Sequence, residues 1–182
     1  MISKFYINEN LSHKVEQVFT QRNIPWYYNS STYDATDEEV SMLKTTTVDS
    51  PQFVHILFDD TGINSPFYND SISVLKDTFD FNTIDMLRAK SNMTLNVSGY
   101  TINHHQPIHT DGNPNVHKTF IYYVNDTDGD TMFFDKDLKI IERITPKKGM
   151  GILFDSDIRH AAQNPIRHYQ RIVLNFVWKW KV

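Results

Sequence analysis

The feature that most constrains the fold is a series of short β-rich runs in the second half of this 182-residue chain. From about residue 93 onward, apolar and β-branched segments alternate with turn signals such as Asn125–Asp130 and Asn164-Pro165. Many short strands at nearly regular spacing are typical of sandwiches and jelly rolls. The fold class we predict is therefore mostly β with flanking helices (α+β). The expected strands are Met93–Tyr100, Lys118–Val124, Thr131–Phe134, Lys139–Ile144, Gly151–Phe154 and Gln170–Trp178.

Helix signals dominate the first ninety residues. Leu11–Gln21 carries apolar side chains at helical spacing, and Thr36–Leu43 begins with a capping-box pattern. Asp70–Arg88 predicts a pair of helices that is broken near Asn82. No linker composition separates two halves, so we expect one domain over 1–182. Residues 1–92 would supply helical support and outer strands packed on one sheet, and residues 93–182 the β core.

Composition excludes several classes of protein. Lys plus Arg number 18 against 22 Asp plus Glu, a net charge of −4, which argues against a surface built to bind nucleic acid. No cysteine is present, so thiol catalysis and cysteine-based metal sites are excluded, and any metal must bind His, Asp or Glu. We find no apolar run long enough for a membrane span and no secretory leader. We expect a cytoplasmic protein without membrane partners.

The candidate metal ligands begin with His109-Thr110-Asp111. In an extended segment, residues i and i+2 project from the same side, so this imidazole and this carboxylate can bind one ion. His160 follows the apolar run Gly151–Phe154, 49 residues after Asp111. That distance accommodates the short strands that bring a chain back across the mouth of a jelly roll. Two histidines and one carboxylate form the facial triad of non-haem Fe(II) oxygenases.

Arg171 opens the otherwise apolar run that ends at Trp178. A buried guanidinium is costly unless it meets an anion, and its planar fork suits a carboxylate. Beside an iron ion with two free adjacent positions, it would hold the far carboxylate of a bidentate 2-oxo acid.

The segment Tyr100–Trp178 resembles the catalytic core of the Fe(II)/2-oxoglutarate-dependent dioxygenases, specifically the prolyl 4-hydroxylase-like branch. The resemblance covers about 80 of the 182 residues, and it implies a double-stranded β-helix. The first ninety residues resemble only loosely the helical support of small stand-alone members, including bacteriophage ones. The motifs that carry the resemblance, in order, are Tyr100, His109-Thr110-Asp111, Tyr123-Val124-Asn125, Gly129-Asp130-Thr131, Pro146-Lys147-Lys148-Gly149, His160, Pro165 and Arg171.

The resemblance implies a set of site residues and cofactors. His109, Asp111 and His160 would hold Fe(II), and Arg171 with Tyr100 would bind the distal carboxylate of 2-oxoglutarate. Thr131 is a further candidate contact. O2 would be the oxidant and ascorbate a supporting reductant. Family halogenases replace the carboxylate with a small residue, so Asp111 predicts hydroxylation.

Several alternatives stay open at this point. His160 and Arg171 lie one residue further apart than the family pattern, which leaves Arg167 as a rival for the anion. His104 and His105 are rival ligands without a carboxylate two places on. Arg88 and Lys90 would either reach a substrate groove or close a helix C-terminus.

Two further patterns favour ordinary structure over a second site. Asp126, Asp128 and Asp130 alternate like a calcium loop, but the glycine and the final acid of such a loop are misplaced. A solvated hairpin turn explains them better. Trp178–Lys181 mixes aromatic residues with cations, which suits base stacking but also suits a terminal strand.

Three hypotheses of function result. The first is an Fe(II)- and 2-oxoglutarate-dependent dioxygenase that hydroxylates an unactivated C–H bond of a peptide, protein or small molecule, with peptidyl proline as the first substrate guess. The second is a jelly-roll binding module that retains metal without turnover. The third is a nucleic-acid demethylase of the same superfamily, which usually carries a second arginine in the last strand. No arginine follows Arg171 there.

Overall fold

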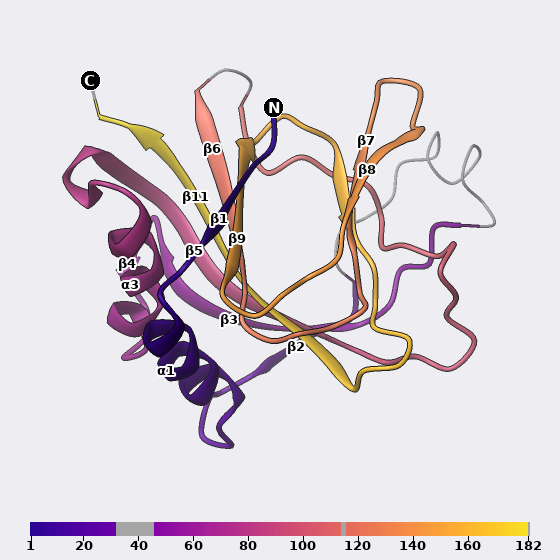
Figure 1. Ribbon diagram of the computed structural model, residues 1–182, viewed down its shortest axis with the longest axis horizontal. Helices are drawn as coiled ribbons and strands as arrows, with labels where there is room; N and C mark the ends of the chain where they lie inside the picture. The colour runs from indigo at the N-terminus through magenta and orange to yellow at the C-terminus, as the bar shows by residue number, and fades with distance from the viewer. Residues whose placement is uncertain (32–45, 114–115, 182) are drawn as a thin grey trace.

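The computed structural model describes residues 1–31, 46–113 and 116–181, and its centre is a large antiparallel sheet. The strand order is β1-β9-β6-β11-β5-β3-β2, with β4 paired to the edge of β3 (Figure 1). The strands are β1 (Ser3–Tyr6), β2 (Tyr27–Asn29), β3 (Gln52–Asp59), β4 (Gly62–Ile63), β5 (Ile84–Leu95), β6 (His117–Tyr123), β9 (Met150–Asp155) and β11 (Gln170–Trp180).

A smaller sheet faces the large one. Its strand order is β10-β7-β8, formed by β10 (His160–Ala162), β7 (Thr131–Phe134) and β8 (Ile140–Ile144). Apolar side chains fill the space between the sheets, and the rings of Phe133 and Phe154 meet edge to face with centroids 5.1 Å apart. Alternation along each strand places one row of side chains in this interior. The predicted jelly roll with flanking helices is confirmed.

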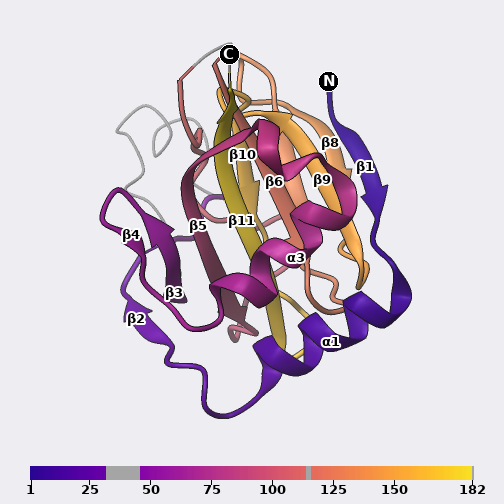
Figure 2. The same ribbon diagram turned by 90° about the vertical axis from the view of Figure 1, so that its left-hand side faces the viewer.

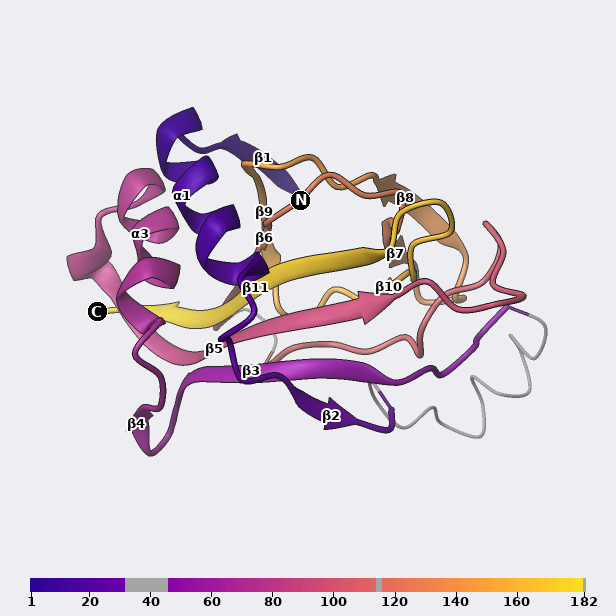
Figure 3. The same ribbon diagram turned by 90° about the horizontal axis from the view of Figure 1, so that it is seen from below.

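The other face of the large sheet is covered by two helices, α1 (Glu9–Thr20) and α3 (Tyr68–Thr78), as Figures 2 and 3 show. Helix α1 begins where the side chain of Asn8 accepts hydrogen bonds from the backbone N–H groups of Asn10 and Leu11. Both helices bury an apolar stripe against the sheet, where Phe79 packs on Trp178 at a centroid distance of 5.6 Å. Neither described helix is both long and apolar enough to cross a membrane.

One predicted element is wrong. Residues 84–88, expected as the second half of a helix pair, form the beginning of strand β5, after α3 and a short 3-10 turn at Phe81–Thr83. The strand pairs with β11 over its length and with β3 on its other side. The first core strand thus begins nine residues before the expected Met93 and ends at Leu95 instead of Tyr100, and the boundary placed at residue 92 falls inside β5. The helix expected over Thr36–Leu43 lies outside the described residues.

Candidate active site

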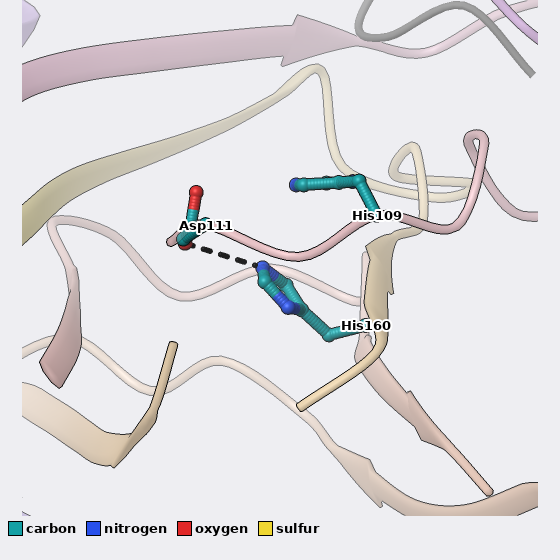
Figure 4. A group of neighbouring side chains, drawn as sticks. All are labelled: His109, Asp111 and His160. Atoms are coloured by element: carbon teal, nitrogen blue, oxygen red, sulfur yellow. Dashed lines mark ion pairs between the residues drawn. The ribbon is translucent and has the colours of Figure 1, made fainter. Parts of the chain in front are cut away.

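The structure brings His109, Asp111 and His160 together at the end of the minor sheet. His109 and His160 form an isolated antiparallel bridge, with both backbone N–H···O distances at 3.0 Å. The backbone N–H of Asp111 donates to the carbonyl of Ser156 at 2.8 Å. One potential ligand atom from each side chain lies within 4.8 Å of the others, and the side chains converge in Figure 4. Among the described residues, no other such group is found.

Backbone carbonyls fix the orientation of both imidazoles. Nδ1 of His109 lies 3.1 Å from the carbonyl oxygen of Pro107, and Nδ1 of His160 lies 2.9 Å from that of Ile158. Because a carbonyl only accepts, each Nδ1 carries a proton, and Nε2 is the ring nitrogen of each side chain that is turned to the other ligands. Nε2 of His160 lies 3.4 Å from Oδ2 of Asp111. The Nε2 atoms of two imidazoles therefore lie near one carboxylate.

Asp111 is held in its ionised form. Arg88 donates to its Oδ1 at 2.7 Å, while Thr119 and Asn175 donate to Oδ2, both at 3.2 Å. Burial raises the pKa of this carboxyl, but the hydrogen bond and charge of His160 and the charge of Arg88 outweigh it and hold the pKa well below its ordinary value. A carboxylate is thus present at neutral pH.

His109 is held neutral. Burial first, and the neighbouring His160 second, lower its pKa to about 4. A neutral imidazole can coordinate a metal at neutral pH without first losing a proton. The donor set of two imidazoles and one carboxylate suits a ferrous ion with open coordination positions. The residues present therefore fit Fe(II).

A cavity between the two sheets extends from this cluster to Arg171. His109 and His160 line it, as do Thr131 and Arg171. Arg171 is buried, with Nε donating to the carbonyl of Gly129 and Nη2 to the hydroxyl of Thr131, both at 2.8 Å. Gly129 is the required residue there, because a Cβ would lie 2.9 Å from Cδ of Arg171 and closer still to the carbonyl oxygen of Gln163.

Arg167, the rival for the anion, lies elsewhere. Its side chain is 85% exposed and pairs with Asp128 at 3.3 Å, outside the residues that line the cavity. The geometry therefore favours Arg171 over Arg167 for the anion.

Tyr100 and two other residues complete the surroundings of Arg171. Tyr100 is buried near Arg171 and its hydroxyl has no partner among the described residues, but it does not line the cavity. Thr94, opposite Arg171 in the β5–β11 ladder, lines the cavity with a buried hydroxyl that no described residue pairs with. Tyr123 donates to the hydroxyl of Thr131 at 2.8 Å, and the guanidinium of Arg171 lies 5.8 Å from its ring centre. Sequence reasoning missed Thr94 and gave Tyr123 no role in the site.

The remaining candidates have structural partners. His104 accepts from the backbone N–H of Thr101, and Nδ1 of His105 donates to the carbonyl of Gln106. Neither belongs to the triad cluster. The expectation that Asp128 belongs to a solvated turn is wrong. Its carboxylate accepts hydrogen bonds from the backbone N–H groups of residues 166–168.

The comparisons with known proteins agree with this geometry. Residues 95–179 match the family model described as the 2OG-Fe(II) oxygenase superfamily. A search of the curated proteins finds no match. Over residues 95–179, the chain is therefore similar to the 2OG-Fe(II) oxygenase superfamily. It is a dioxygenase that uses Fe(II) and 2-oxoglutarate.

Solved structures share the fold at low identity. A 2OG-Fe(II) oxygenase family oxidoreductase from Burkholderia pseudomallei superposes with a TM-score of 0.67 at 14% identity, covering 98% of this chain and 84% of that one. A prolyl hydroxylase from Trichoplax adhaerens, in complex with a hypoxia inducible factor peptide fragment, superposes with a TM-score of 0.54 at 16% identity. The match covers 98% of this chain and 83% of that one. The epimerase SnoN of nogalamycin biosynthesis superposes with a TM-score of 0.60 at 10% identity, and the match covers 97% of this chain and 76% of that one. At these identities the likeness concerns the fold alone.

Proposed function

We propose that this dioxygenase hydroxylates an unactivated C–H bond, with a peptidyl proline as the first substrate to test. The observation that carries the proposal is the cavity, which has His109 and His160 at one end and the buried cation of Arg171 at the other. The intact carboxylate of Asp111 supports hydroxylation, since a halogenase would lack it. The Trichoplax adhaerens protein of the same fold is a prolyl hydroxylase in complex with a peptide, which supports proline as the first substrate.

The three candidate metal ligands and the residues around Arg171 have defined tasks in this proposal. His109, Asp111 and His160 would hold Fe(II), and Arg171 would orient 2-oxoglutarate through its distal carboxylate, together with Thr131 and with Tyr100. When bound, these two partners supply the oxidation, in which 2-oxoglutarate becomes succinate and CO2 and one atom of O2 enters the substrate. The chain contributes a neutral His109, an ionised Asp111 and an enclosed cavity.

Succinate formation tests the proposal. We expect the protein with Fe(II), 2-oxoglutarate and ascorbate to form succinate, and a proline-containing peptide that is a substrate to increase the rate and gain 16 Da in mass. Asp111→Ala should abolish both signals, whereas Asp137→Ala, at an exposed aspartate on the turn after β7, should keep them. Absence of succinate under all conditions, with Mn(II) and 2-oxoglutarate still bound, would instead support the metal-retaining binding module.

The demethylase alternative has no observation in its favour. Downstream of Arg171, the inward position of β11 that faces Lys90 is Asn175, not the second arginine of that branch. Formaldehyde release from methylated oligonucleotides would contradict this assignment.

A further inference from the structure

Strand β5 presents a second cation to the cavity, Lys90, that the proposed reaction has not used. It lies opposite Asn175 in the β5–β11 ladder, whereas Arg171 lies opposite Thr94. At about 3.4 Å per residue, the four steps of strand from Arg171 to Asn175 span about 14 Å. Lys90 and Arg171 therefore line the same cavity from different ends. Lys90 lies near His109 and Asp111, whose charges interact with it.

The charges around Lys90 are not balanced by the chain. Its ammonium has no hydrogen bond or ion pair with any described residue, and no carboxylate is among the described residues that line the cavity. Asp111, the described acid whose charge acts on Lys90, is already paired with Arg88 at 2.7 Å. One carboxylate thus stands against two cations, and a divalent ion would increase the imbalance. Burial, and then the charge of Arg88, lower the pKa of Lys90 to about 8, as expected for a cation without a counter-ion.

A second polar residue, Asn92, lies near Lys90 on the same strand. Asn92, two residues further along β5, lines the cavity, and its buried amide oxygen has no partner among the described residues. A buried amide oxygen without a donor is costly, so a ligand N–H is expected to meet it. Lys90 and Asn92 therefore place a cation and an amide oxygen on the same face of β5, toward the cavity.

We propose that Lys90 binds a carboxylate of the substrate, so that this enzyme oxidises a carboxylate-bearing compound with an N–H group that meets Asn92. The inference deepens the proposed function and rests on it, because it requires 2-oxoglutarate to occupy the Arg171 end. Two sources of such a carboxylate exist. It belongs either to a free N-acylated amino acid or to an acidic residue of a peptide.

Binding to the loaded protein tests the proposal without knowledge of the natural substrate. The first measurement is the affinity for Mn(II) and then 2-oxoglutarate, by isothermal titration, in wild type and in Lys90→Met. The probes are then titrated into the protein saturated with both, so that Arg171 is already occupied. The small pair is N-acetylglycyl-L-proline and N-acetylglycyl-L-prolinamide, both of which carry the glycine N–H, and the peptide pair is a capped proline-containing tetrapeptide with glutamate or with glutamine.

We expect at least one carboxylate probe to bind the loaded wild type, and to bind Lys90→Met about tenfold or more weakly. The matching amide should bind both proteins equally weakly. Lys90→Arg, which keeps the charge, should retain the affinity within a few-fold and shows that a loss in Lys90→Met is not misfolding. Lys179→Met removes an exposed lysine of β11 that pairs with Asp85, outside the cavity, and should match wild type.

Three results would overturn the inference. The first is that no carboxylate probe binds the loaded wild type. The second is that carboxylate and amide probes bind alike in all variants. The third is that Lys90→Met weakens 2-oxoglutarate itself, which would assign Lys90 to the cosubstrate. If wild type failed to bind Mn(II) and 2-oxoglutarate in the first measurement, the proposed function would fail with it, and this is distinguishable from the three results above.

Discussion

Arg171 combines full burial with partners that carry no charge. Its Nε and Nη2 donate to a backbone carbonyl and to the hydroxyl of Thr131, which position the guanidinium without neutralising it. A buried cation with only neutral partners is unfavourable by itself and gains when an anion binds. The residue is therefore arranged as a preformed receptor for a carboxylate.

Replacing Arg171 should weaken the binding of 2-oxoglutarate and leave the binding of the metal unchanged. For Arg171→Met we expect the 2-oxoglutarate Kd to rise by about 10- to 100-fold, because a hydrogen bond to a charged group contributes about 1.5–3 kcal/mol. Mn(II) affinity should remain within about twofold, since His109, Asp111 and His160 are untouched. Isothermal titration measures both.

Arg167→Met is the matched control, because it removes an exposed arginine four residues away. It should leave the 2-oxoglutarate Kd unchanged. If Arg167→Met weakened 2-oxoglutarate and Arg171→Met did not, the assignment of the distal carboxylate would be wrong.

At the scale of elements, one aspartate holds the loop that precedes β11. Asp128 accepts the backbone N–H groups of residues 166–168 at 3.1, 2.9 and 3.3 Å. Burial raises the pKa of Asp128, but these donors and the side chain of His168 outweigh it and hold the pKa well below its ordinary value. The carboxylate thereby fixes the segment from which Arg171 enters the interior.

Asp128→Asn should lower the free energy of unfolding by about 1–3 kcal/mol at pH 7, because charged hydrogen bonds become neutral ones. A carboxyl whose folded pKa lies below its unfolded value stabilises the fold above the unfolded pKa and loses this contribution as the pH falls further. The difference between wild type and variant should therefore shrink below about pH 4. Urea unfolding at several pH values measures it, and a difference that stayed constant from pH 7 to pH 3 would contradict the assignment.

Local patterns predicted most of the β core but failed where pairing partners decide the structure. The strands that end near Tyr123, Phe134, Ile144 and Phe154 lie where alternation and turn residues placed them. Residues 84–88 were expected as helix from their apolar spacing, yet they form a strand because β11 and β3 supply partners on both sides. Such partners lie far away in the sequence and leave no local signal.

The same reason limits the prediction of the site. The spacing of His109, Asp111 and His160 marked them in advance, since the two neighbours share one side of an extended segment. The place of Thr94 and Lys90 in the cavity follows only from the register of β5 against β11. Lys90 and Thr94 each lie two residues from Asn92, so the three side chains share one face of a strand. This pattern could be used only once residues 84–95 were known to form a strand.

At the scale of the whole molecule, the large sheet separates two apolar clusters with different tasks. The cluster on its outer face packs α1 and α3 against the sheet and contains Leu75 and Trp178. The cluster on its inner face lies between the sheets and contains Phe133 and Phe154, whose rings contact His160 with centroid distances of 6.1 and 4.9 Å. Because these ring contacts join a candidate metal ligand to the inner cluster, stability and metal affinity should be separable by mutation.

Leu75→Ala and Phe133→Ala test this separation as a pair. Both side chains are fully buried, so we expect each variant to lose about 2–5 kcal/mol of unfolding free energy, measured by urea unfolding. Phe133→Ala should also weaken Mn(II) several-fold, because the cavity it leaves frees the imidazole of His160. Leu75→Ala, on the far side of the sheet, should bind Mn(II) as wild type does, provided that both are measured well below their melting temperatures. Equal losses of Mn(II) affinity in the two variants would mean that the helical layer and the site are coupled through the sheet, and the division into two clusters with separate tasks would have to be abandoned.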